Sequence, residues 1–262
     1  MLMTGSRSFD RRWFLSAAAA LPLCSCTSHI EQAQEHKESS QRGQLRQKPT
    51  VGSDPVESPQ VEEPSLKAES SDDHFQSDSL SVLVNKHHPL EPIHYHPQDL
   101  VSFGPVLLRA EAAEHAQALF LEATRQGLSP TALSGYRSYE DQVNTYKHWV
   151  NTYGKEQADT ASARPGYSEH QTGLALDIGS ASGGCNLAVC FSQTPEAQWF
   201  ARQAHRFGFI LRFPYWKHEF TGYFYESWHF RYIGAAEAQR YYQSHADCLE
   251  TFWGFGPAPT YL

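Results

Sequence analysis

The sequence predicts an α+β domain over residues 81–262, with a small, mainly antiparallel sheet flanked by helices. Helical and extended segments are mixed along this part of the chain, without the regular strand–helix repeat that builds a parallel sheet. The extended segments are also short, and no internal repeat is visible. With 40% apolar residues, the chain can bury a core of ordinary size in one such domain.

Cap residues and apolar spacing predict the helices. The expected helices cover residues 110–126, 139–152, 195–206 and 235–245. Apolar residues recur on one face of the first, and Gly127 provides its stop. Ser138 can cap the second, because Asp141 stands three residues further on, as in a capping box. Thr194 before Pro195 is a start signal for the third helix.

Apolar residues that alternate along the chain predict the strands. The expected extended segments are 128–138, 173–178, 209–213 and 227–233, and a polar, glycine-containing loop precedes the second. In that second segment, "GLALDI", Leu174, Leu176 and Ile178 alternate with Ala175 and Asp177. Asp177 therefore lies on the strand face opposite the large apolar side chains.

A carboxylate at a half-buried strand position needs a partner, since an unpaired charge there costs on the order of several kcal/mol. His170 precedes Asp177, and the later cluster "ESWH" contains Glu226 and His229. Two imidazoles and a carboxylate with a fourth position open suit a catalytic zinc ion on the sheet. Alternatively, Asp177 pairs with an arginine and both histidines are ordinary hydrogen-bonded residues. Spacing alone leaves both open, because an H-E-x-x-H helix is absent.

Strand parity adds a structural expectation near this cluster. In "WHFRYI", residues 228–233, Trp228 and Phe230 share one face of the strand and His229 lies on the other. Glu226 would fall with Trp228 if the strand were regular. For Glu226 to reach a metal beside His229, the backbone must turn or bulge near Ser227.

The first 26 residues resemble an export signal. Arg11 and Arg12 precede an apolar run over residues 13–23 that is too short to span a bilayer, as in a twin-arginine signal. The following "LCSC" resembles a bacterial lipobox, with Cys26 as the lipidated first residue. The alternative is an ordinary cleaved signal with incidental cysteines. Both interpretations place the mature protein outside the cytoplasm, in the periplasm or cell envelope.

The segment that follows the signal is predicted to be a disordered tether. Residues 27–80 are rich in Ser, Gln, Glu, Lys, His and Pro, with only isolated apolar residues. Such a segment cannot bury enough surface to offset the entropy lost on ordering. Order is therefore expected from residue 81, near "SVLVNKHHPL".

Charge and cysteine content bound the partners and the compartment. The formal net charge is −8, and the scattered Lys and Arg residues form no basic stripe, which argues against a nucleic-acid partner. In an oxidising compartment, Cys185 and Cys190 in "GGCNLAVC" are close enough to close a small disulfide loop. Cys248 would then remain unpaired.

Three motifs in register resemble a known family. They are "SGYRS" at residues 134–138, "SEHQTGLALD" at 168–177 and "ESWHFRY" at 226–232. In order and spacing they resemble the zinc D-alanyl-D-alanine carboxypeptidases of the VanY-like group. The likeness extends to "LVNKHHPL" at the front of the domain, so it covers residues 83–245.

The resemblance implies roles for the clustered polar residues. His170, Asp177 and His229 would bind one zinc ion per chain, and Glu226 would be the catalytic carboxylate. This choice of ligands agrees with the donor set inferred from the residues themselves.

The resemblance also implies substrate-binding residues. Arg137 would hold the substrate's terminal carboxylate, a role that suits the planar guanidinium fork. Ser168 and Gln142 fall where the family has polar pocket residues. The alternatives are a turn former for Ser168 and a solvated helix residue for Gln142.

The function that the resemblance implies is removal of the terminal D-alanine from peptidoglycan stem peptides. The enzyme would be an exported monomer held at a membrane through lipidated Cys26. One alternative is an L,D-carboxypeptidase acting on tetrapeptide stems, because the same motifs occur with both specificities. Another is a non-catalytic, zinc-containing cell-wall-binding module. The mark of such a module would be a missing glutamate or ligand, yet Glu226 and all three ligands are present.

Overall fold

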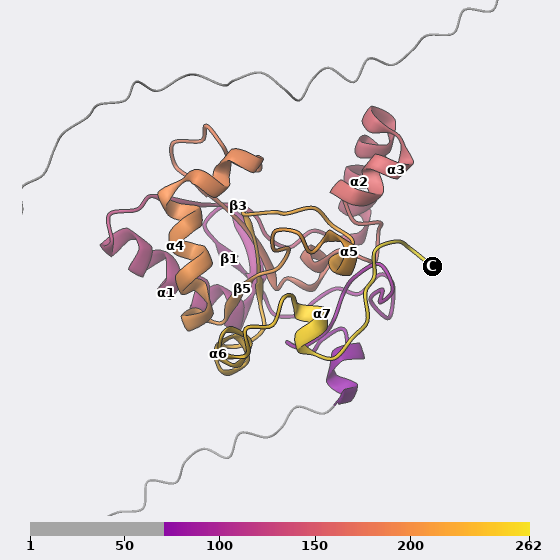
Figure 1. Ribbon diagram of the computed structural model, residues 1–262, viewed down its shortest axis with the longest axis horizontal. Helices are drawn as coiled ribbons and strands as arrows, with labels where there is room; N and C mark the ends of the chain where they lie inside the picture. Colours follow the sequence, from indigo (N-terminus) through magenta and orange to yellow (C-terminus); the bar gives the residue numbers. More distant parts are fainter. Residues whose placement is uncertain (1–70) are drawn as a thin grey trace, which may run out of the picture. The chain divides into compact units, whose positions relative to one another are not determined.

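The computed structural model describes residues 71–262 (Figure 1). The strands are β1 (Leu100–Phe103), β2 (Val106–Arg109), β3 (Pro130–Ser134), β4 (Ala175–Ser180), β5 (Phe209–Leu211) and β6 (His229–Tyr232). The helices are α1 (Ala110–Arg125), α2 (Tyr139–Tyr153), α3 (Lys155–Ala161), α4 (Pro195–Gln203), α5 (His218–Thr221), α6 (Ala235–Ser244) and α7 (Leu249–Phe252). Short 3-10 helices are η1 (Ser71–Phe75), η2 (Glu169–Thr172), η3 (Val189–Gln193) and η4 (Ala204–Phe207). The expected export signal, Cys26 and the tether up to residue 70 lie outside the described residues.

The main sheet has four antiparallel strands in the order β3-β4-β6-β5, and β1 and β2 form a separate antiparallel hairpin. Helices flank the sheet, with α1 and α4 together on one side (Figure 1). This arrangement confirms the predicted α+β class. Among residues 71–262, no helix is both long enough and apolar enough to cross a membrane.

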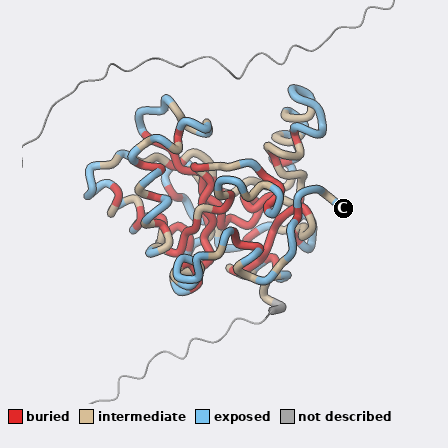
Figure 2. Tube along the Cα trace, viewed as in Figure 1, coloured by how far each residue is buried: buried red, intermediate tan, exposed pale blue. Residues whose placement is uncertain are grey.

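The two faces of the sheet differ in chemistry because β4 and β6 alternate apolar and polar side chains. Leu176 and Phe230 are cross-strand partners, fully buried in the main apolar core. Asp177 and His229 form the next cross-strand pair and therefore lie on the opposite face. The central strands are buried along their length (Figure 2). The sheet thus packs a core on one face and presents polar groups on the other.

Local capping explains where the predicted helices begin and end. The Ser138 hydroxyl accepts a hydrogen bond from the Asp141 backbone N–H at 3.1 Å and starts α2 as predicted. The Thr194 hydroxyl accepts from the Ala197 N–H at 3.2 Å and starts α4. The expected helix over residues 195–206 continues beyond Gln203 as the 3-10 helix η4 rather than as an α-helix.

Several short elements were not predicted. The helix α3 occupies part of the segment expected to be a polar loop, and the β1–β2 hairpin precedes α1 where no strand was expected. The four-residue helices α5 and α7 were not predicted either. All these elements are short, so their apolar periodicity is too brief to recognise.

The packed chain also begins earlier than the expected boundary at residue 81. His74 Nδ1 lies 2.8 Å from the Ser81 carbonyl, and the Leu83 N–H donates to the His74 carbonyl at 2.9 Å. The Ser77 hydroxyl donates to the Glu91 carbonyl at 2.8 Å. Residues 71–80 therefore belong to the domain and not to a tether. These hydrogen bonds, together with the packing of Leu80 on the core and of His74 on Trp253, hold the segment to distant residues, which explains why its polar composition was misleading.

A buried ion cluster ties α7 to the sheet. Arg212 is fully buried and donates to both Glu250 oxygens, at 2.7 and 3.0 Å. It also donates from Nε to Glu169 Oε1 at 2.8 Å. Since burial removes these charges from water, each depends on its partners for stability.

We expect Glu250→Ala to lower the free energy of unfolding by about 3–5 kcal/mol, because it removes one of the two carboxylates that neutralise buried Arg212. Asp247→Ala is the matched control. Asp247 pairs with Lys217 at 2.8 Å, but its side chain is 66% exposed, so the expected loss is about 1 kcal/mol or less. Urea denaturation of both variants measures the difference, and equal losses would contradict this account of α7.

Candidate functional site

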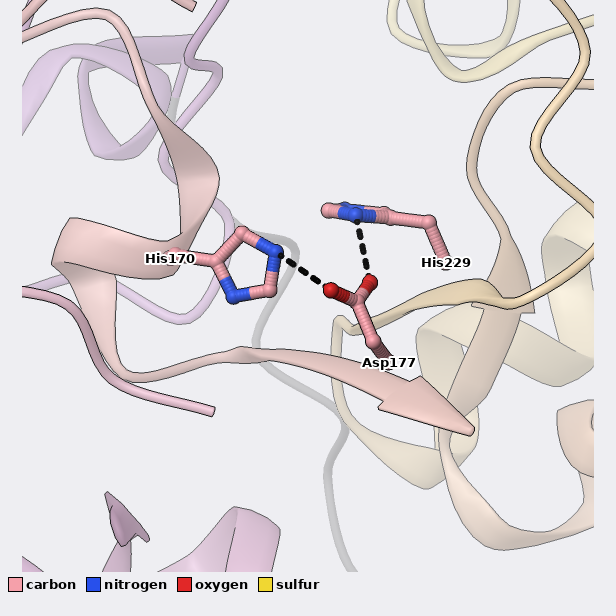
Figure 3. Close-up of side chains that lie close together, drawn as sticks. All are labelled: His170, Asp177 and His229. Carbon is pink, nitrogen blue, oxygen red and sulfur yellow. Dashed lines mark ion pairs between the residues drawn. The ribbon is translucent and has the colours of Figure 1, made fainter. Parts of the chain in front are cut away.

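The three predicted metal ligands come together on the polar face of the sheet (Figure 3). η2 carries His170, β4 carries Asp177 and β6 carries His229. His170 Nε2 lies 3.3 Å from Asp177 Oδ2, and His229 Nδ1 lies 3.2 Å from Asp177 Oδ1. One possible ligand atom from each residue lies within 4.8 Å of the other two. All three side chains are buried.

A hydrogen bond behind each imidazole orients the ring. His170 Nδ1 lies 2.7 Å from the Gly135 carbonyl, and His229 Nε2 lies 3.2 Å from Glu169 Oε2. When these nitrogens donate, His170 Nε2 and His229 Nδ1 are left with free lone pairs directed towards Asp177. An oxygen behind a metal-binding imidazole fixes the tautomer and the ring orientation in this way.

The position of the Gly135 carbonyl depends on a local irregularity of β3. The β3–β4 register shifts between Ala132 and Ser134, which places a bulge directly before Gly135. A Cβ atom at Gly135 would collide with the Leu107 carbonyl oxygen of β2. Only glycine allows the backbone at residue 135 to lie this close to β2. In this position the Gly135 carbonyl can accept a hydrogen bond from His170 Nδ1.

The charge around Asp177 suits a cation. Asp177 Oδ1 is buried, and no group among residues 71–262 makes a well-formed hydrogen bond to it. Burial alone would raise the pKa of Asp177, yet His170 and His229 hold that pKa well below its usual range. Burial would lower the pKa of His229, but the carboxylates of Asp177 and Glu169 raise it to about 10. Two nitrogens and one carboxylate that attract positive charge fit zinc with one coordination position open.

Glu226 lies at a turn immediately before β6. The His229 N–H donates to the Glu226 carbonyl at 3.3 Å, which confirms the turn predicted near Ser227. The turn brings Glu226 Oε2 to 3.8 Å from His229 Nδ1. Burial raises the pKa of Glu226 to about 7, although His229 acts to lower it. A carboxyl group with this pKa can exchange a proton near neutral pH.

Arg137 lies just before α2 with two side-chain partners. Its Nη1 donates to Gln142 Oε1 at 2.9 Å and its Nη2 donates to the Ser134 hydroxyl at 3.1 Å. Gln142 is fully buried and donates to the Ala163 carbonyl at 2.6 Å. Gln142 is therefore not a solvated helix residue, and its contacts fix the orientation of the guanidinium group.

All the predicted site residues face one cavity of about 330 Å³. Its polar and charged lining includes Arg137, Gln142, Ser168, Glu169, His170, Asp177, Glu226 and His229, together with Thr145, Thr160 and Ser162. Apolar lining comes from α2 through Trp149, from the β4–α4 connection through Leu187 and Val189, and from Val84, Phe213, Phe224 and Trp228. The predicted Cys185–Cys190 disulfide closes that connection, and Cys248 is free and buried. One cavity therefore gives access to both the cation site and the guanidinium group.

Sequence reasoning missed the residue that supports His229. Glu169 is buried, and its Oε1 accepts hydrogen bonds from Arg212 Nε at 2.8 Å and Arg231 Nη1 at 2.9 Å. One signal was available, because strand parity places Arg231 on the same face as His229. A buried arginine on that face requires a carboxylate partner, and Glu169 adjoins the predicted ligand His170.

Comparison with known proteins identifies the family. The family model VanY, described as D-alanyl-D-alanine carboxypeptidase, matches residues 105–235, which is half of the chain. This chain belongs to the VanY family. The matched segment includes every residue of the polar cavity lining. The resemblance seen in the three sequence motifs is thereby confirmed.

The similar proteins carry names for different carboxypeptidase specificities. The putative carboxypeptidase YodJ of Bacillus subtilis is 40% identical over 172 residues, which are 62% of this chain and 63% of that protein. The chain thus spans less than two thirds of the length of this relative. A solved structure of the LdcB LD-carboxypeptidase is 37% identical with a TM-score of 0.63, covering 68% of this chain and 87% of that one. The D,D-pentapeptidase VanY, solved as a variant with Zn(II), is 32% identical with a TM-score of 0.57, covering 65% of this chain and 97% of that one.

We expect Glu169→Gln to weaken zinc binding by about 10- to 100-fold, because the amide no longer provides the charged acceptor behind His229. Glu196→Gln is the matched control, since Glu196 is equally buried but accepts from the Ser129 N–H away from the cation site. Competition with a chromophoric chelator measures the zinc dissociation constant of each folded variant. An unchanged constant in Glu169→Gln would show that this carboxylate does not support the ligand.

Proposed function

We propose that this chain is a zinc-dependent D-alanyl-D-alanine carboxypeptidase that removes the terminal D-alanine from peptidoglycan stem peptides. The observation that carries the proposal is the presence of three elements in one cavity: a His-Asp-His ligand set, a carboxyl group beside it and a guanidinium group. His170, Asp177 and His229 would hold one zinc ion per chain. Similarity to a VanY structure that contains Zn(II) supports the choice of metal.

The residues of the cavity divide the chemistry between them. Zinc, when bound, acts as a Lewis acid and makes water a nucleophile near neutral pH. Glu226 accepts a proton from the attacking water and later returns it to the leaving amine. Its buried position beside His229 suits both transfers. Zinc binding would displace the proton that Asp177 and Glu169 otherwise favour on His229, because only a deprotonated imidazole nitrogen binds a metal. The hydrogen bonds behind the two rings leave His170 Nε2 and His229 Nδ1 as the ligand atoms.

Arg137 accounts for cleavage at the end of a peptide. A guanidinium group can hold a free carboxylate through two parallel hydrogen bonds. Ser134 and Gln142 already fix two of its nitrogens, so the remaining N–H groups can face the cavity in a defined direction. Ser168 lines the same cavity and provides a further polar contact for the peptide. This arrangement favours a carboxypeptidase over an endopeptidase.

An L,D-carboxypeptidase acting on tetrapeptide stems is the second candidate. Its support is the likeness to LdcB, which is an LD-carboxypeptidase and is 37% identical to this chain. The ligands, Glu226 and Arg137 serve the same hydrolysis in either case. The two candidates differ only in the configuration and length of the stem that the cavity walls accept.

The location proposed for the enzyme is outside the cytoplasm, where peptidoglycan is found. The Cys185–Cys190 disulfide is consistent with an oxidising compartment. Lipidation of Cys26 would hold the enzyme at a membrane, and the catalytic domain would act there as a monomer.

Release of D-alanine by the purified chain tests the function. We expect chelator-sensitive loss of one D-alanine from a muramyl pentapeptide, measured by mass spectrometry. Loss from the matching tetrapeptide alone would favour the L,D alternative. No release from either substrate by zinc-loaded protein would reject both and leave a non-catalytic wall-binding module.

Glu226→Gln should retain zinc while kcat falls by about 10²- to 10⁴-fold, since it removes the proton acceptor.

Gln142→Leu tests the orientation of Arg137. The variant removes the acceptor of Arg137 Nη1, so we expect KM to rise about tenfold with a smaller change in kcat. Asn144→Leu is the matched control, because it makes the same amide-to-leucine change on an exposed position of α2. Steady-state kinetics with the pentapeptide separate the two parameters. A similar rise in KM for both variants would argue against a specific role of Gln142.

A further inference from the structure

The connection between β4 and α4 places apolar side chains at the cavity. Leu187 and Val189 line it, although these side chains are 51% and 70% exposed. A ligand that covers these aliphatic side chains removes their apolar surface from water, which favours binding. Their position in the cavity that contains Arg137 and Glu226 identifies the ligand as the peptide bound by those residues.

The base of this connection is fixed although its tip is exposed. The Cys185–Cys190 disulfide closes the loop, and the following residue, Phe191, is fully buried in the main core. Asn186 Oδ1 accepts from the Ser180 N–H at 2.9 Å, and Asn186 Nδ2 donates to the Ser180 carbonyl at 3.2 Å. The loop is thus held against the end of β4.

Gly179 makes this attachment possible. A Cβ atom at that position would collide with the side-chain amide of Asn186. The amide therefore lies directly over the β4 backbone, where only glycine leaves room. Disulfide, amide and glycine together set the position of Leu187 relative to Asp177 on the same strand.

The backbone of Leu187 is unusual for a leucine. Its φ angle is +52°, in the left-handed region that favours glycine or asparagine. A leucine in this conformation carries a backbone strain that a glycine would relieve. Since the Leu187 side chain is half exposed, the core does not require it.

We propose that Leu187 and Val189 form a specificity wall that receives an alanyl methyl group of the stem peptide. The inference rests on the proposed function and assigns the apolar part of its substrate recognition. Cys185, Cys190 and Asn186 act as positioning residues for this wall. A small aliphatic side chain is the chemical group that such a wall favours over hydrogen or a charged side chain.

Leu187→Gly gives a sharp test, because it removes the side chain and relieves the left-handed backbone at once. We expect thermal stability equal to or above that of the parent, but a KM raised about tenfold for the alanyl peptide. His245→Gly is the matched control. His245 has a φ of +54° and is exposed at the end of α6, outside the cavity lining, so the same change should leave KM unaltered.

Glycyl substrates separate a specific contact from a general disturbance. The parent should prefer the alanyl peptide by about tenfold over a peptide with glycine at the terminal or the penultimate position. Leu187→Gly should largely lose that preference at one of these positions, which identifies the methyl group that is recognised. A preference unchanged at both positions would overturn the proposal.

The positioning residues provide an independent arm of the test. Asn186→Ala, and separately the paired change Cys185→Ser with Cys190→Ser, should raise KM for the alanyl peptide while kcat is retained. Unchanged KM in both would reject the positioning role. Parent protein that releases no D-alanine would instead refute the proposed function, so the two failures are distinguishable.

Discussion

The structure depends on the buried carboxylate of Glu169. Its Oε1 accepts hydrogen bonds from Arg212 and Arg231, and its Oε2 lies 3.2 Å from His229 Nε2. Arg231 also donates to the carbonyls of Leu80 and Val82, while Arg212 donates to Glu250 on α7. One carboxylate therefore joins the beginning and the end of the domain to the imidazole that faces Asp177. The hydrogen bonds of Glu169 that stabilise the core therefore also fix the orientation of the His229 ring.

Charge balance explains why the cation site is distinct from this core cluster. The two buried arginines are neutralised by the two glutamates that they contact, so that cluster needs no further ion. Asp177 and Glu226 remain, beside two imidazoles whose outward nitrogens are already hydrogen bonded. Their carboxyl groups are the acidic groups of the cavity that the arginine cluster does not neutralise. Arg137 hydrogen bonds to the neutral side chains of Ser134 and Gln142, so a substrate carboxylate would neutralise its charge.

Local signals in the sequence predicted most of the sheet, the longer helices and the meeting of Asp177 with His229. Caps and strand parity act over a few residues, so one sequence is sufficient to reveal them. The missed features depend on distant partners: Glu169 lies 43 residues from Arg212 and 62 from Arg231. Residues 71–80 escaped detection for the same reason, because hydrogen bonds to later residues order them. Residues that line the cavity wall, such as Leu187, also leave no local pattern in the sequence, because their role depends on the residues across the cavity.

In the proposed function, chemistry and selectivity are carried by different parts of this cavity. The proposed ligands lie on β4, β6 and η2, where cross-strand pairing and Glu169 leave little freedom to vary. The proposed apolar wall lies on a loop whose tip residues, Leu187 and Val189, are exposed and outside the apolar core. A shared scaffold can therefore serve both an LD-carboxypeptidase such as LdcB and a D,D-pentapeptidase such as VanY, each about a third identical to this chain. It follows that the loop and α2, rather than the three motifs, are where substrate preference within the family has to be sought.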